Sequence, residues 1–175
     1  MPKFPQDRLL FFTRMMLTLL LGLTIIAGAV ALLLIPVLLV RREDFAARLA
    51  ASGIDLAGVP SIALLLALAA GIAVLAFLFL RQLRRIVDSV ADGDPFVPAN
   101  ADRLRNMGWL AVAMQVLLIP ATGLVIWFDA LPQKPNVHYS DNTSFGGLVL
   151  AMLLFVLARV FRVGSAMRDE LEGTV

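Results

Sequence analysis

Side chains able to carry chemistry are scarce in this sequence, and they form no catalytic or metal-binding pattern. The 175 residues include no cysteine and a single histidine, His138. This inventory excludes disulfides, thiolate chemistry and multi-histidine metal sites. Intramembrane proteolysis needs a Ser–His pair, paired aspartates or a zinc site, and none of these can be assembled here. We therefore expect a protein that is not an enzyme and uses no cofactor or metal, with His138 as a solvated loop residue.

The composition is that of an integral membrane protein. Hydrophobic residues make up 60% of the chain, and the mean hydropathy is +0.88. Soluble domains contain about 45–50% apolar residues. A bilayer core about 30 Å thick needs roughly 20 apolar residues in a helix. The sequence predicts an all-α, four-helix membrane bundle forming a single domain over residues 1–175, with spans at about 15–40, 61–80, 109–128 and 145–163.

The first apolar run could be a cleaved signal peptide or a permanent membrane anchor. Basic residues precede it, and Ala27-Gly28-Ala29 is similar to a cleavage site. The run continues through Val40, however, which is too long for the apolar region of a signal peptide, about 7–15 residues. We interpret it as an uncleaved anchor.

The distribution of lysine and arginine predicts an orientation. Eleven of these residues lie before span one, between spans two and three, or from Arg159 at the end of span four onward, against four in the other two loops. Cytoplasmic segments of membrane proteins are enriched in lysine and arginine. Both termini, the segment 81–108 and the tail 164–175 are therefore expected on the cytoplasmic side.

The spans themselves hold few polar groups. No charged residue or histidine lies deep in any span, although ion-coupled transporters and proton relays usually need one there. Gln115 and Thr122 flank Pro120 in the third span. They could bond a neighbouring helix, or they could line a polar path through the membrane.

Small residues follow one face of the second span. Ala63, Ala67 and Gly71 recur every four residues, and small side chains let helix backbones approach closely in lipid. The stripe could pack against another span of the same chain, or it could form the interface of a homodimer.

The stretch "VADGDPFVPANADRLR", residues 90–105, is the longest polar segment. Gly93 is placed to end the preceding helix as a C-terminal cap. Asp94 and Pro95 then signal a turn, because a residue before proline is disfavoured in helical geometry. We expect Phe96 to dock on the bundle or on the preceding helix.

A second helix is predicted after this turn. Asn100 is a suitable N-cap, and Arg103 and Arg105 lie on the helix that leads into span three. The segment 81–108 thus reads as a cytoplasmic helical hairpin that extends spans two and three. It could dock a partner, or it could be only structural.

This hairpin also carries a family resemblance. The stretch "LRRIVDSVADGDPFVPANADRLRNMGW" and the tail "FRVGSAMRDELEGTV" resemble a bacterial family, the domain of unknown function 2975. The matching motif positions are Gly93, Pro95, Phe96, Asn100, Leu104 and Arg105. The resemblance implies a small four-span inner-membrane protein without an established activity, often encoded beside a small helix-turn-helix regulator.

Two hypotheses about function follow. In the first, the hairpin and the acidic tail residues Asp169, Glu170 and Glu172 present a docking surface for a soluble cytoplasmic regulator. In the second, the protein is a small transporter, channel or immunity-type protein acting within the bilayer. A net charge of +2 is too small to indicate direct nucleic-acid binding.

Overall fold

Helices are the only regular secondary structure among the residues that the structure describes. The computed structural model describes residues 6–51, 58–129 and 146–172, so His138 lies outside the described residues. The helices are α1 (Gln6–Val40), α2 (Arg42–Ala51), α3 (Gly58–Ala91), α4 (Pro98–Asp129) and α5 (Gly146–Glu172). Four of them, α1, α3, α4 and α5, are long and apolar enough to cross a membrane. The short α2 lies between the first two of these helices along the chain.

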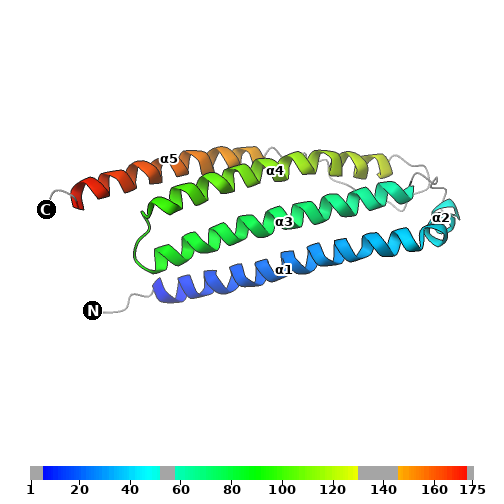
Figure 1. Cartoon of the computed structure of the whole chain (residues 1–175), viewed down its shortest axis with the longest axis horizontal. Coiled ribbons are helices and arrows are strands. Elements are labelled where there is room, and N and C mark those ends of the chain that lie inside the picture. The colour runs from blue at the N-terminus through cyan, green and yellow to red at the C-terminus, as the bar shows by residue number, and fades with distance from the viewer. Residues whose placement is uncertain (1–5, 52–57, 130–145, 173–175) are drawn as a thin grey trace.

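The long helices lie side by side in an open row rather than in a closed bundle. Their order across the row is α1, α3, α4, α5 (Figure 1), and each helix packs only on its neighbours in that row. Among the described residues, α1 makes no contact with α4 or α5. The predicted four-helix bundle is therefore wrong in its packing. Apolar helices are not forced to close on themselves in lipid, because hydrocarbon solvates their outer faces.

The seam between α1 and α3 follows a heptad spacing. The residues of α1 buried there are Leu17, Leu21, Gly28, Ala31 and Leu38. Spacings of three, four and seven keep side chains on one face of a helix. The helices approach closely where a β-carbon built on Gly28 would lie 3.4 Å from that of Ala73. The remaining faces of α1 are largely exposed apolar surface, as expected for contact with lipid.

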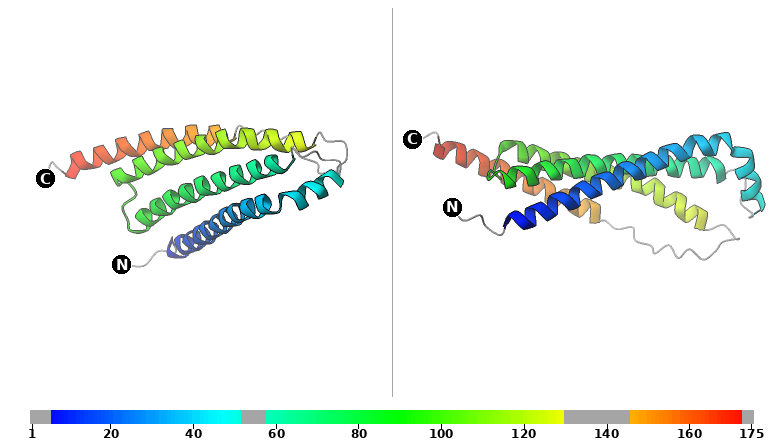
Figure 2. Two further views of the ribbon diagram at one scale, coloured as in Figure 1. Left: turned by 45° about the vertical axis from the view of Figure 1, so that its right-hand side comes forward. Right: turned by 90° about the horizontal axis from the view of Figure 1, so that it is seen from below.

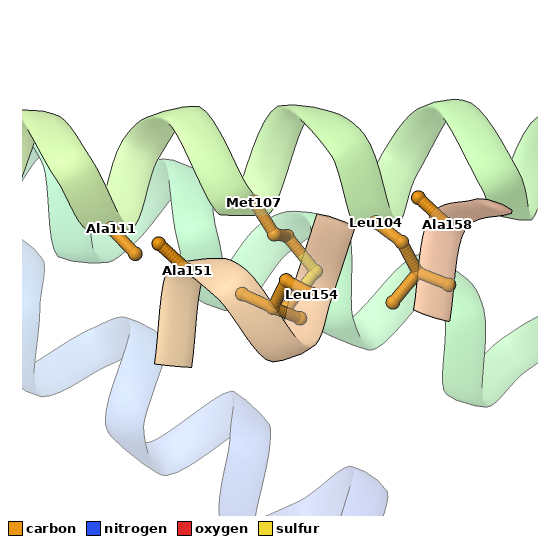
Figure 3. Packing of buried hydrophobic residues seen from close by; sticks show 6 residues of the cluster. All are labelled: Leu104, Met107, Ala111, Ala151, Leu154 and Ala158. Atoms are coloured by element: carbon orange, nitrogen blue, oxygen red, sulfur yellow. The ribbon is translucent and has the colours of Figure 1, made fainter. Parts of the chain in front are cut away.

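The α4–α5 seam forms the main buried cluster. It consists of Leu104, Met107 and Ala111 from α4 and Ala151, Leu154 and Ala158 from α5 (Figure 3). Both sets follow the spacing i, i+3, i+7, which places each set on one helix face. Side chains of α3, including Phe79 and Leu83, also pack against the cluster. The cluster thereby fixes α5 against the half of α4 that adjoins the α3–α4 connection.

The two ends of the row differ. The start of α1, the connection between α3 and α4, and the end of α5 lie together at one end (Figure 1). The other end of the row carries α2. Helix α5 begins about halfway along α4 rather than at its far end (Figure 2). Gly147, in the first turn of α5, accordingly lies against Gln115 in the middle of α4. The motif residues between Gly93 and Arg105 belong to the α3–α4 connection and the start of α4, so they lie at the end of the row where α5 overlaps α4.

Candidate interaction surface at the α3–α4 turn

The α3–α4 turn, residues 92–97, is closed by backbone hydrogen bonds at the end of α3. The amide of Gly93 donates to the carbonyl of Val90 at 3.2 Å, and the amide of Asp94 donates to that of Ser89 at 3.1 Å. This pair of bonds is a Schellman cap, which satisfies carbonyls that the helix end leaves free. Gly93 adopts a φ of +87°, a region that L-residues with a β-carbon disfavour. The sequence-based prediction that Gly93 ends the helix is confirmed.

Asn100 organises the turn from inside. Its side chain is fully buried, at 0% exposure. The Nδ2 group donates to Ser89 Oγ at 2.7 Å and to the carbonyl of Pro95 at 2.9 Å. Its Oδ1 accepts a hydrogen bond from Arg103 Nη1 at 2.8 Å. One amide side chain therefore joins the end of α3, the turn and the first turns of α4.

The predicted role of Asn100 as N-cap is wrong. Helix α4 begins at Pro98, two residues earlier, and the amide of Asn100 donates to the carbonyl of Val97 at 2.8 Å. Proline is favoured at the first helical position, where a missing amide donor costs nothing and its fixed φ suits the helix. Asn100 therefore lies within the first helical turn, and its side chain is free to reach back to α3.

Arg103 links the two helices of the hairpin. Besides bonding Asn100, its Nη1 donates to the backbone carbonyl of Arg85 at 3.1 Å. A guanidinium can hold several acceptors at once because its donors are arranged in a rigid fork. Arg103 thus connects α4 to the backbone of the last turns of α3.

Two ion pairs attach the hairpin to α5. The carboxylate of Asp94 pairs with Arg168, and Asp102 pairs with Arg162 at 2.8 Å. A third pair joins α3 to α1, between Arg14 and Asp88 at 2.8 Å. Exposed pairs of this kind each contribute about 0–1 kcal/mol. Their main consequence is geometric, since they hold the ends of α1, α3, α4 and α5 in register.

Phe96 docks on α5, the last helix of the chain. Its ring centroid lies 5.4 Å from that of Phe161. A β-carbon built on Gly164 would approach the Phe96 ring to 3.1 Å, so the absence of a side chain at Gly164 gives the ring its space. The expectation that Phe96 docks on the helices is met, although 43% of the side chain stays exposed.

An apolar groove runs beside this aromatic contact. We call it the turn groove, and it has a volume of about 600 Å³. It is lined by Phe96 from the turn and by Phe155, Val156, Arg159, Val160, Val163, Gly164 and Met167 from α5. A partly exposed aromatic ring at the edge of an apolar groove is suited to receiving an apolar side chain of another molecule.

The polar residues predicted within span three lie away from this surface. Gln115 and Thr122 are both half-buried, farther along α4. Gln115 Oε1 lies 2.3 Å from the position that a β-carbon on Gly147 would occupy, so the glutamine packs against the first turn of α5. This position fits contact between helices. The structure does not bring either residue together with the turn.

The small-residue stripe of α3 is partly used within the chain. A β-carbon built on Gly71 would lie 2.9 Å from Leu117 Cδ2, so Gly71 faces α4. Ala63 is half-buried and Ala67 is exposed. Packing within the chain therefore accounts for Gly71, whereas Ala67 lies on an open face.

Sequence reasoning missed the residues that receive the hairpin. Ser89, Phe161, Arg162 and Arg168 complete its contacts. The partners of Asp94 and Asp102 lie 74 and 60 residues away along the chain, respectively. No local pattern signals such pairs, although the basic residues near the end of the chain indicated that positive charge gathers there.

The chemistry available at this surface is recognition by shape, hydrogen bonding and charge. Within the described helices, no group of three or more histidine, aspartate or glutamate side chains is placed to hold a metal ion. The architecture and this surface together define a multi-pass membrane protein with four apolar helices and a structured polar turn.

The chain belongs to the family described as "Protein of unknown function (DUF2975)", whose model matches residues 13–175. The match covers nearly the whole chain and agrees with the resemblance carried by the motif around Gly93 and Phe96. No curated protein and no solved structure matches this chain.

Proposed function

We propose that this protein is a membrane-anchored docking protein. Its α3–α4 turn and the adjoining part of α5 bind a soluble regulatory protein, such as a small helix-turn-helix transcription regulator. The bound side is the cytoplasmic side of the bacterial inner membrane. The proposal favours docking over the purely structural role that the sequence left open for the hairpin.

The observation that carries the proposal is the position of the turn groove. Arg159 is the first charged residue of α5, and Met167 lies eight residues beyond it. At a rise of about 1.5 Å per residue, the far end of the groove lies about 12 Å past Arg159. The groove thus runs outward from Phe155 and Val156, in the uncharged stretch of α5, and its outer end at Met167 is within reach of a soluble protein.

The rigidity of the turn supports the same conclusion. A loop that only reverses the chain needs no fully buried polar side chain, yet Asn100 is buried and makes three hydrogen bonds. A preorganised surface binds a partner without first losing conformational entropy. The acidic tail would extend this surface, and Glu170 is exposed there.

The orientation follows from charge. The start of α1, the α3–α4 turn and the end of α5 lie at one end of the row (Figure 1). The sequence before the first span, the segment 81–108 and the stretch from Arg159 onward hold eleven of the fifteen lysines and arginines. The positive-inside tendency favours the cytoplasm for that end.

The proposal is tested by placing a charge in the turn groove. Met167 lines the groove and is 55% exposed, so Met167→Glu introduces a carboxylate without burying it in the fold. Ala166→Glu is the matched control, because Ala166 directly precedes Met167 on α5, is exposed and does not line the groove. Each variant is expressed in a strain that lacks the wild-type gene, and the transcriptome is compared with those of the wild type and the deletion.

We expect Met167→Glu to reproduce the transcript changes of the deletion and Ala166→Glu to behave as wild type. Both variants should reach the membrane at wild-type levels. If deletion changes no transcript, or if both variants behave as wild type, the docking proposal is refuted.

A further inference from the structure

A second groove lies along the α4–α5 pair and is lined by arginines. We call it the arginine groove, and it has a volume of about 400 Å³. Its lining residues are Arg105, Phe155, Ala158, Arg159, Arg162 and Val163. It shares Phe155, Arg159 and Val163 with the turn groove but contains no residue of the turn.

We propose that the arginine groove binds the phosphate of an anionic phospholipid. The acyl chains of this lipid would run from the groove along the exposed apolar faces of α4 and α5. This inference goes beyond the proposed docking function, and neither depends on the other.

The arginine groove keeps a net positive charge after the nearby carboxylate of Asp102 is taken into account. Asp102 pairs with Arg162 at 2.8 Å and lies 3.7 Å from Arg105. Arg159 forms no ion pair with any described residue. Three guanidinium groups and one carboxylate leave two positive charges, which suits a phosphodiester bound by charge-assisted hydrogen bonds.

The position of the groove along the helices matches the phosphate level of a bilayer. Residues 106–128 of α4 and 146–158 of α5 contain no charged side chain. Arg105 and Arg159 therefore mark the place where both apolar stretches end, and both residues line the groove. Arginines at this depth lie close to lipid phosphates rather than to hydrocarbon or bulk water.

Trp109 lies one turn further into the apolar stretch and supports this depth. Its side chain is 62% exposed, and its ring makes an edge-to-face contact with Phe155, with centroids 5.4 Å apart. Exposed tryptophans concentrate where hydrocarbon meets headgroups. Because Phe155 lines the groove, a lipid held there would pass its first acyl carbons close to Trp109.

Trp109 can report this binding directly. The chain has two tryptophans, so Trp127→Phe leaves Trp109 as the single fluorescent tryptophan. The full-length protein is reconstituted into phosphatidylcholine bilayers that contain a small fixed fraction of phosphatidylglycerol. In one sample the phosphatidylglycerol carries brominated acyl chains. In the other, an equal amount of phosphatidylcholine is brominated instead.

We expect brominated phosphatidylglycerol to quench Trp109 several-fold more than brominated phosphatidylcholine at equal mole fraction. The double variant Arg105→Gln, Arg159→Gln should remove this preference, since each basic residue near an anionic surface changes binding about fivefold. The matched control is Arg81→Gln, Arg84→Gln, which removes the same charge from exposed positions of α3 outside the groove. This control should keep most of the preference.

Three results would overturn the proposal. The first is equal quenching by the two lipids in the wild-type background. The second is an equal loss of preference in the groove and control variants, because the effect would then reflect net charge alone. The third is loss of preference on adding inorganic phosphate, but not on adding sodium chloride of equal ionic strength, because a free anion would then occupy the groove. The lysine variants Arg105→Lys and Arg159→Lys guard against misfolding and should retain the preference.

Discussion

Replacing Asn100 by alanine should loosen the α3–α4 turn more than any other single change of similar size. The substitution removes two hydrogen bonds donated to Ser89 Oγ and to the Pro95 carbonyl. It also removes the acceptor of Arg103 Nη1. The hydroxyl of Ser89 keeps its own bond to the carbonyl of Ile86, but the side chain that bonds the Pro95 carbonyl is lost.

The size of the effect follows from these contacts. A neutral hydrogen bond contributes about 1 kcal/mol net, and one to a charged group contributes about 1.5–3 kcal/mol. Arg103 keeps its bond to the Arg85 carbonyl, which limits the loss on that side. We therefore expect Asn100→Ala to lower the free energy of unfolding by about 2–4 kcal/mol. Asn100→Asp keeps the shape and the acceptor of Arg103, but it loses both donated bonds and places a carboxylate oxygen against the Pro95 carbonyl oxygen, so it should have a similar effect.

The assay combines global and local readouts. Unfolding of the purified protein in mild detergent gives the stability change, and hydrogen exchange reports on the turn. The amides of Gly93 and Asp94, which close the end of α3, should exchange faster in Asn100→Ala. The control is Asn106→Ala on the same helix, where the side chain is exposed and a loss below about 0.5 kcal/mol is expected.

The reasoning would be refuted if Asn100→Ala and Asn106→Ala had equal stability and equal exchange at the turn. Asn100 would then fill space without organising the hairpin. A second contradictory result would be a lower free energy of unfolding in Asn100→Ala but not in Asn100→Asp. The shape of the side chain, and not the hydrogen bonds that it donates, would then stabilise the turn.

Two further predictions concern glycines. Gly93→Ala should lower the free energy of unfolding by about 1 kcal/mol because of its positive φ alone, since the space around it is open. Gly22→Ala, also in open space but in a helix, should cause no loss, and thermal unfolding compares the two. Gly147→Ala should destabilise the start of α5, because its new β-carbon would meet Gln115 Oε1 at 2.3 Å and the glutamine would have to leave the interaction that it makes in its present position. A double-mutant cycle with Gln115→Ala should then recover stability, and strictly additive losses would refute the contact.

The sequence predicted the helices well because their signals are local. Four apolar runs of sufficient length specify four apolar helices, and the glycine at position 93 specifies where α3 ends. The docking of Phe96 was also predictable, since an apolar side chain in a polar turn gains by burial. The helix that receives it, α5, could not be identified because the contact spans 65 residues of sequence.

The packing of the helices was less predictable. In water, an apolar face must find a partner, so a pattern of apolar residues indicates contacts. In lipid the exposed faces of α1 and α5 are already solvated, and the same pattern does not distinguish an open row from a bundle. The role of Asn100 was mistaken for a related reason. Both Pro98 and Asn100 are residue types that favour the start of a helix. Helix α4 begins at Pro98 because the proline ring already fixes a helical φ.

The central claim is that the α3–α4 turn is held as a fixed surface against α5. The absence of cysteine makes this directly measurable, because Phe96→Cys and Phe161→Cys introduce the only two thiols. In native membranes a short bifunctional thiol reagent should join these positions within one chain in high yield, since the two rings lie 5.4 Å apart. A control pair on α1 and α5, Thr24→Cys with Val156→Cys, should give none because those helices do not touch. Absence of the Phe96–Phe161 product, or equal yields from both pairs, would contradict the account.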